Sequence, residues 1–178
     1  TQSGLIEQLA NILDDRYKKL DILICNAGIL GSLTPINHID QKEWNKVIST
    51  NVTANITLLK SFDSLLKMSE SAQVLFLTSN IVELKKPFWG IYAASKAALE
   101  QIAFSYAAEV QQTNISVNLI DPGTIATSLR AKAMPGEDKN LLTQPEDLSD
   151  FFIEILNNNK NLHSQIFRFN EWKEVQIN

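Results

Sequence analysis

Short apolar runs that alternate with helix-like segments constrain the fold of this chain more than any other feature of the sequence. The runs lie at residues 22–25, 74–77, 115–121 and 165–169, and turn-forming residues follow the first three. The intervening segments at 5–13, 40–68, 91–112 and 145–156 carry apolar residues with helical spacing. Alternating strands and helices are typical of a parallel sheet whose strands are buried on both faces. Right-handed crossovers place helices on both faces, so we predict an α/β, doubly wound fold.

The overall composition excludes several classes of protein. The chain has 178 residues, of which 44% are hydrophobic, so it has room for one domain with one core. No apolar run approaches the roughly 20 residues of a membrane-spanning helix. The net charge of −4 argues against a nucleic-acid partner. Cys25 is the single cysteine, which excludes an internal disulfide and favours a reducing, cytoplasmic setting. The chain begins at Thr1 rather than at Met, so we expect a processed, trimmed or partial product.

Polar segments follow three of the predicted strands. They are 26–28 (Asn-Ala-Gly), 78–80 (Thr-Ser-Asn) and 121–124 (Asp-Pro-Gly-Thr). The carboxyl ends of parallel strands share one edge of the sheet, and ligands bind in the crevice outside that edge. We therefore expect these three segments to line one ligand-binding cleft.

A tyrosine and a lysine four residues apart open the long helix predicted at 91–112. Tyr92 and Lys96 are expected on the same helical face, where the ammonium can stabilise a tyrosinate and lower the phenol pKa. Such a tyrosine can act as a general acid or base. The alternative is a buried tyrosine beside a solvated lysine, which the pair alone does not exclude.

The order of further residues around this pair decides between the two interpretations. Ser79 ends the preceding strand, and Asn51 lies in the helix before it, while 26–28 and 122–123 end the flanking strands. This ordered set resembles the short-chain dehydrogenase/reductase family over nearly the whole chain. The resemblance implies a Rossmann-like fold and an NAD(P)-dependent oxidoreductase that interconverts a carbonyl and a secondary alcohol on a small molecule.

The resemblance also assigns catalytic roles by position. Tyr92 would exchange a proton with the substrate oxygen, and Lys96 would lower its pKa and bind the nicotinamide ribose. Ser79 would hydrogen-bond the substrate oxygen, and Asn51 would hold a water that links Lys96 to solvent.

The cofactor would be bound from two sides of the cleft. Its adenosine side would pass Asn26, Ala27 and Gly28, and its nicotinamide side would contact Tyr92, Lys96, Pro122, Gly123, Ile125 and Thr127 by the same resemblance. His38 and His163 have no ligand-like spacing, so no metal site is expected.

One family feature has no counterpart in this sequence. The family begins with a strand and a turn of the form Thr-Gly-x-x-x-Gly-x-Gly that binds the pyrophosphate, whereas the glycines here stand at 4, 28, 31, 90, 123 and 136. We therefore expect residues 1–178 to form the C-terminal catalytic part of a Rossmann-like domain, with the family's strands four to seven and without the N-terminal phosphate-binding part. NAD and NADP both remain open, because the family distinguishes them in the absent part.

This incompleteness leaves two functional hypotheses and two predicted interfaces. The chain is either the catalytic part of an oxidoreductase or a non-catalytic remnant or split half that does not bind the dinucleotide alone. The apolar strand 22–25 would have an unpaired edge, which predicts a partner chain or a larger polypeptide there. The helices 40–68 and 91–112 form the usual dimer face of the family, which predicts a homo-oligomer.

Two loops near the predicted cleft have alternative interpretations. Phe88 and Trp89 either line the substrate entrance or pack under their loop. Residues 128–140 stand where the family has a mobile lid, and Arg130 and Lys132 there either attract an anionic substrate or are solvated charges.

Overall fold

A computed structural model describes residues 3–158 and 162–177. Its centre is a four-stranded sheet in the order β1-β2-β3-β4, and every neighbouring pair is parallel. The strands are β1 (Ile22–Cys25), β2 (Ala72–Leu77), β3 (Ile115–Asp121) and β4 (Ile166–Arg168). The predicted α/β, Rossmann-like parallel sheet is thereby confirmed.

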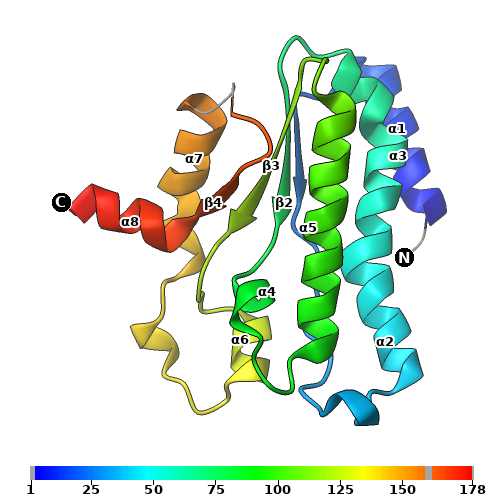
Figure 1. Cartoon of the computed structure of the whole chain (residues 1–178). Helices are drawn as coiled ribbons and strands as arrows, with labels where there is room; N and C mark the ends of the chain where they lie inside the picture. Colours follow the sequence, from blue (N-terminus) through cyan, green and yellow to red (C-terminus); the bar gives the residue numbers. More distant parts are fainter. Residues whose placement is uncertain (1–2, 159–161, 178) are drawn as a thin grey trace.

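Helices cover both faces of the sheet, as right-handed crossovers require. Figure 1 shows α1, α3 and α5 on one side and α7 with α8 on the other, while α4 and α6 lie near the carboxyl ends of the strands. The helices are α1 (Ser3–Tyr17), α2 (Gln41–Ile48), α3 (Ala54–Lys67), α4 (Ile81–Leu84), α5 (Gly90–Val110), α6 (Ser128–Ala133), α7 (Ser149–Asn158) and α8 (Phe169–Ile177). None of the helices in the described ranges is long and apolar enough to cross a membrane.

The predicted helix at 40–68 has an internal irregularity that periodicity did not reveal. Asp40 caps its start, because the carboxylate accepts the main-chain N–H groups of Lys42 and Glu43 at 3.0 Å each. Between α2 and α3 the chain makes a π-helical turn, Ser49–Thr53. Such turns are rare and often occur at functional sites, and this one contains Asn51.

The larger core lies between the sheet and the layer of α1, α3 and α5. Alternate residues of the central strands point into it, among them Val74, Phe76, Val117 and Leu119, all with no exposed surface. The opposite side chains of β2 and β3 form a second cluster with α7 and α8. Phe151, Phe169 and Trp172 pack together in that cluster with ring centroids 5.4 to 5.7 Å apart.

The expectation that every strand is buried on both faces is wrong for β1. Ile22 and Ile24 are each 41% exposed, whereas Leu23 and Cys25 pack against the larger core. Within the described residues β1 pairs with β2 alone, so one edge of it has no neighbouring strand. The second helix layer packs on β2 and β3, and this leaves one face of β1 open.

The structure contains several short elements that the sequence did not predict. The helix expected at 145–156 begins as a 3-10 turn, Pro145–Leu148, before α7, and the last strand has three residues. The helices α4, α6 and α8 were not predicted. They are short, and tertiary packing rather than a long apolar period stabilises them.

Candidate active site

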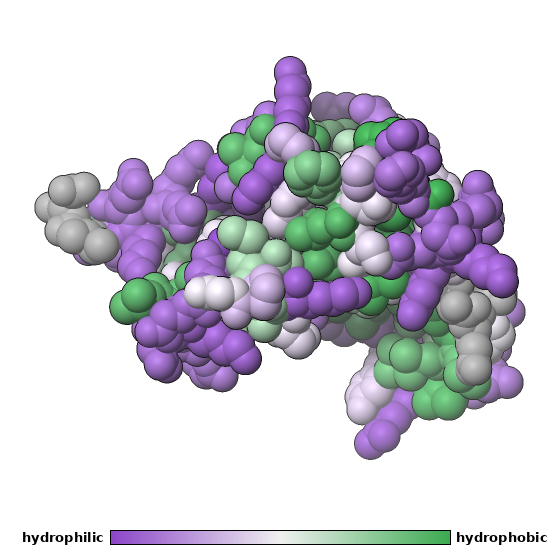
Figure 2. Space-filling model, turned by 90° about the horizontal axis from the view of Figure 1, so that it is seen from below, coloured by the Kyte–Doolittle hydropathy of each residue, from purple (hydrophilic) through white to green (hydrophobic). Residues whose placement is uncertain are grey.

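The carboxyl ends of β1, β2 and β3 meet the start of α5 at one end of the sheet, as predicted. Figure 2 views this end of the molecule from below, where apolar side chains gather within a largely hydrophilic rim. Ser79 follows β2, Tyr92 and Lys96 lie in the first two turns of α5, and Asn51 lies in the π-helical turn. These four residues come from three separate segments of the chain, and their contacts show whether they form one site.

Tyr92 and Lys96 are both buried and lie side by side. Their exposed fractions are 8% and 4%, and the Lys96 Nζ lies 5.8 Å from the centroid of the Tyr92 ring. Lys96 donates a hydrogen bond of 2.7 Å to the main-chain carbonyl of Leu77, the last residue of β2. A strand end thus holds the ammonium beside the phenol.

Ser79 completes the contact around the phenol. A side-chain hydrogen bond connects Ser79 with Tyr92. The Ser79 hydroxyl also accepts the main-chain N–H of Ile81 at 3.4 Å, which holds it at the start of α4. A hydroxyl, a phenol and an ammonium are therefore adjacent, as in a site that transfers a proton to or from an oxygen.

Burial dominates the ionisation of this group. It raises the pKa of Tyr92 to about 12, and the nearby Asp121 charge raises it further while the Ser79 hydrogen bond opposes both. Burial lowers the pKa of Lys96 to about 8, although the Glu100 charge partly opposes this. The direction for Tyr92 is opposite to the lowering expected from the sequence, because loss of hydration outweighs an ammonium that hydrogen-bonds Leu77.

Asn51 is fully buried and connects the segment after β1 to α5. Its side-chain oxygen accepts the Ile29 N–H at 2.8 Å, and its amide donates to the Ile29 carbonyl and the Ser95 hydroxyl at 2.9 Å each. These bonds hold the segment after β1 against α5. The predicted water-relay role of Asn51 stays a prediction.

The residues predicted to contact the cofactor flank this group. Asn26, Ala27 and Gly28 are exposed at the end of β1. A Cβ atom on Gly28 would lie 3.5 Å from Lys96 Nζ, so the glycine keeps space open beside the ammonium. The space beside Lys96 is compatible with the dinucleotide that these residues are predicted to contact.

The segment after β3 lies on the other side. Gly123 has a φ of +72°, and a Cβ there would lie 2.9 Å from the Asn170 side-chain oxygen, so the turn requires glycine. Ile125 is buried and bridges Thr143, while the Thr127 hydroxyl caps α6 by accepting the Arg130 N–H at 3.2 Å. Pro122 is half-buried beside them.

The structure also shows the surroundings of three loop residues that the sequence left open. Trp89 is buried and meets Tyr92 edge-on at 6.2 Å, whereas Phe88 is 57% exposed. Arg130 forms a two-pronged ion pair with Glu137, with both N···O distances at 2.6 Å, so it is a structural partner rather than a solvated charge. Across the described residues, no group of three His, Cys, Asp or Glu side chains could hold a metal ion.

Two acidic residues near the site received no role of their own from the sequence. Asp121 is 5% exposed at the end of β3, and Glu100 lies one turn beyond Lys96 on α5. Burial raises the pKa of both carboxyls. Their positions, directly before the Pro-Gly turn and four residues after the lysine, were the available signals.

Comparison with known proteins identifies the class to which this fold and site belong. The model of the family described as short chain dehydrogenase matches residues 1–138. The chain therefore belongs to the short-chain dehydrogenase/reductase family.

Related sequences and solved structures agree with this assignment. The uncharacterized oxidoreductase YciK of Escherichia coli K12 is 35% identical over 83% of this chain and 58% of that protein. Dehydrogenase/reductase SDR family member 4 of Rattus norvegicus is 31% identical over 68% of this chain and 43% of that protein. A short chain dehydrogenase from Salmonella enterica serovar Typhi superimposes with a TM-score of 0.90 at 30% identity, covering 94% of this chain and 70% of that one. The chain thus spans about half the length of these curated relatives.

Proposed function

We propose that this chain is the catalytic part of an NAD(P)-dependent oxidoreductase that interconverts a carbonyl and a secondary alcohol on a small molecule. The observation that carries the proposal is the contact of Tyr92 with both Ser79 and Lys96 at the carboxyl ends of the strands. Hydride transfer to a carbonyl requires a proton at the same oxygen, and these three groups can bind that oxygen and deliver the proton.

Each residue has a distinct task in the reduction direction. The Ser79 hydroxyl hydrogen-bonds the carbonyl oxygen and orients it toward Tyr92. The Tyr92 phenol gives its proton to that oxygen, and the Lys96 ammonium stabilises the resulting tyrosinate. Asn51 keeps the loop after β1 against α5. A bound nicotinamide cofactor supplies the hydride, and the reverse direction uses the same groups in the opposite order.

The proposed cofactor is NAD or NADP. A short chain dehydrogenase from Escherichia coli CFT073 that is complexed with NADPH superimposes with a TM-score of 0.89 at 32% identity, covering 94% of this chain and 70% of that one. In this chain Asn26, Ala27 and Gly28 would contact its adenosine side. The nicotinamide side would meet Tyr92, Lys96, Pro122, Gly123, Ile125 and Thr127.

We further propose that residues 1–178 are the C-terminal catalytic part of a Rossmann-like domain. Two observations support this: the share of its relatives that the chain spans, and the open edge and exposed apolar face of β1. The rest of such a domain, in the same polypeptide or in a partner chain, would pair with β1 and bring the phosphate-binding turn.

The second candidate is a non-catalytic remnant or split half. The absence of a glycine-rich phosphate turn among the glycines of this sequence favours it for the isolated chain. Titration of the chain with NADH and with NADPH, followed by cofactor fluorescence, separates the two. Saturable binding in the micromolar range supports the oxidoreductase, and no binding up to millimolar cofactor supports the remnant.

Replacing Tyr92 with phenylalanine tests the catalytic proposal directly. In the protein at its full natural length, Tyr92→Phe is expected to reduce turnover by at least about a hundredfold while cofactor affinity changes little. Tyr17→Phe is the matched control, because Tyr17 is 55% exposed on α1. Unchanged turnover in Tyr92→Phe would remove Tyr92 from its proposed role.

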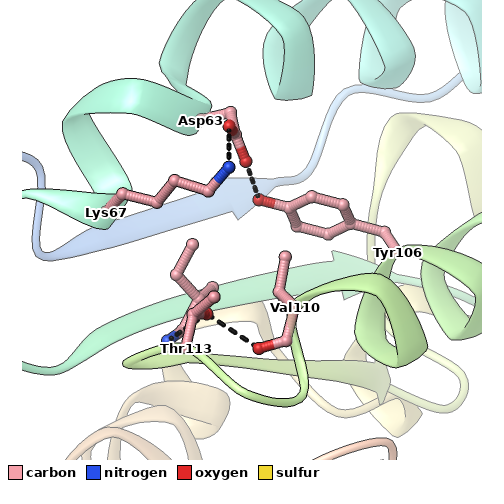
Figure 3. Close-up of polar contacts among 6 residues, drawn as sticks. Asp63, Lys67, Tyr106, Val110 and Thr113 are labelled. Atoms are coloured by element: carbon pink, nitrogen blue, oxygen red, sulfur yellow. Dashed lines mark hydrogen bonds and ion pairs between the residues drawn. The ribbon is translucent and has the colours of Figure 1, made fainter.

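A homo-oligomer through the helices α2, α3 and α5 is proposed as the assembled form. A groove of about 630 Å³ lies between α3 and α5, with apolar residues such as Ile56 and Val110 in its lining. Figure 3 shows the polar contacts beside it, where Asp63 binds the Tyr106 hydroxyl at 3.0 Å and the Lys67 ammonium at 2.7 Å. Light scattering on Ser105→Arg within the groove, with Ser64→Arg outside it as the control, tests this assembly.

A further inference from the structure

The residues on either side of Ser79 are each held by an acidic side chain. The Thr78 hydroxyl donates to a carboxyl oxygen of Glu100, and the Asn80 main-chain N–H donates to the carboxyl of Asp121. Glu100 comes from α5 and Asp121 from the end of β3. Carboxyl groups from two different elements thus hold the turn at 78–80, which carries Ser79.

Asp121 also holds the turn that directly follows it in the chain. Its Oδ1 accepts the Gly123 N–H at 3.0 Å. One carboxyl, 5% exposed, therefore connects the Ser79 turn with the Pro122–Gly123 turn. The two turns follow the neighbouring strands β2 and β3, so this connection holds them at a fixed separation.

The charges around these carboxyls do not neutralise them fully. Arg168 is the register partner of Asp121 across β3 and β4, but its guanidinium pairs with Glu83 on α4 at 2.6 Å and with Glu171 on α8 at 3.8 Å. The charges of Glu83 and Arg168 act on both Glu100 and Asp121, and Asp121 also acts on Glu100. Lys96 and Tyr92 on α5 are the remaining ionisable groups that these two carboxyls influence.

The two carboxyls act on different members of the site. The charge of Asp121 raises the pKa of Tyr92, which favours the protonated phenol. The charge of Glu100 raises the pKa of Lys96, which favours the ammonium. Both effects favour a protonated Tyr92 and a protonated Lys96, which is the state in which the proposed reduction begins.

We propose that Glu100 and Asp121 are positioning residues that clamp Thr78 and Asn80, so that Ser79 stays in hydrogen-bonding distance of Tyr92 and the two cleft turns stay at a fixed separation. The assignment of a catalytic purpose to this clamp rests on the proposed function. The clamp itself belongs to the protein without ligands and can be tested there.

Amide hydrogen exchange measured by NMR tests the clamp without any turnover. Asp121→Ala is expected to speed exchange at the Gly123 and Asn80 amides by at least about tenfold, because both lose their acceptor. Asp121→Asn keeps an oxygen acceptor of the same size but loses the charge, so both amides should exchange at an intermediate rate. Glu70→Gln, an exposed change at the other end of the sheet, alters neither.

The outcomes of this measurement are distinct. Unchanged exchange in a folded Asp121→Ala variant would overturn the clamp. If that variant does not fold, faster exchange in Asp121→Asn than in Glu70→Gln supports the clamp, and equal exchange in these two variants overturns it.

A titration of Lys96 tests the effect of the Glu100 charge on the Lys96 pKa, which a merely structural role of Glu100 would not produce. NMR of the Lys96 side chain should show a midpoint lower by about one pH unit in Glu100→Gln than in the parent chain. Thr78→Val removes the hydrogen bond and keeps the Glu100 charge, so its midpoint should stay near the parent value. Equal midpoints in the parent chain and Glu100→Gln would contradict the role of Glu100.

Turnover of the protein at its full natural length connects the clamp to catalysis. Asp121→Ala and Thr78→Val should lower kcat on the order of tenfold to a hundredfold, with a smaller change in the cofactor KM. If both variants turn over substrate as fast as the wild-type protein, the positioning role is overturned. A wild-type protein without turnover would contradict the proposed function, and the hydrogen-exchange rates alone would then decide whether the clamp exists.

Discussion

The two faces of β1 show how differently one strand can be buried. Leu23 and Cys25 point toward α1 and α3 and join the larger core, while Ile22 and Ile24 on the other face are each 41% exposed. The side chains are similarly apolar, so their composition does not explain the difference. What lies over each face explains the difference. Helices cover one face, whereas on the other side α7 packs on β2 and β3 and leaves Ile22 and Ile24 partly exposed.

On the side of the sheet that faces α7, the boundary between the covered part and the open face of β1 lies at Gln73 of β2. Gln73 is 3% exposed, and its amide donates to the Leu156 carbonyl at 2.8 Å, whereas its side-chain oxygen has no partner among the described residues. A cavity of about 240 Å³ lies there, between Ile22 of β1 and Ile153 of α7. A polar atom without a partner beside a cavity marks the place where the packing stops.

The strongest test of this comparison is a pair of truncations. Phe76→Ala removes a side chain with no exposed surface on the covered face, and it should lower the free energy of unfolding by about 3–5 kcal/mol. Ile24→Ala on the open face should cost below about 1 kcal/mol, because much of that side chain is already hydrated. Urea unfolding of both variants measures the difference. Equal losses would show that the open face is covered in solution.

The covered part of the fold was predictable from the sequence because its residues follow simple periods. Val74 to Leu77 are consecutive apolar residues and form most of β2, and the repeat after Asp40 gives α2 and α3. The open face of β1 was not predictable from local pattern, since Ile22 and Ile24 belong to an apolar run that is typical of a buried strand. The π-helical turn at Asn51 leaves no mark on an apolar repeat either.

For the candidate site, the spacing of Tyr92 and Lys96 predicted their proximity but not their electrostatics. Tyr92 and Lys96 are adjacent as their separation requires. The pKa of Tyr92 is raised rather than lowered because the helix start is buried under Trp89 and because Asp121 faces it. Burial and a charge from another strand are tertiary properties, which the pair of residues alone does not encode.

The thiol of Cys25 reports on the covered face of β1. Cys25 is 2% exposed, and burial raises its pKa to about 12. At pH 9 an unfolded cysteine is largely ionised, so alkylation by iodoacetamide should be at least about a hundredfold slower in the folded chain than in urea. Mass spectrometry follows the reaction. Comparable rates in the two states would mean that the covered face opens readily.

A smaller effect is expected at the boundary residue. Gln73→Leu removes an oxygen without a partner and also a hydrogen bond to Leu156, so the two effects oppose each other. The free energy of unfolding should change by no more than about 1 kcal/mol in either direction. Gln73→Ala is the matched control and should be clearly less stable, because it adds empty space. A loss above about 2 kcal/mol in Gln73→Leu would show that the lone oxygen has a partner in solution.

The smallest effect on stability is expected from a charge on the open face, and this change separates packing from association. Ile24→Lys places a hydrated ammonium where the side chain is already partly exposed, so the free energy of unfolding should shift by about 0.5 kcal/mol or less. A lysine beside an unpaired strand edge opposes pairing with another chain, so light scattering should show less self-association than in the parent chain. Leu141→Lys, at a residue that is 84% exposed outside the sheet, should leave association unchanged. Equal association of Ile24→Lys and the parent chain would mean that the edge of β1 does not take part in it.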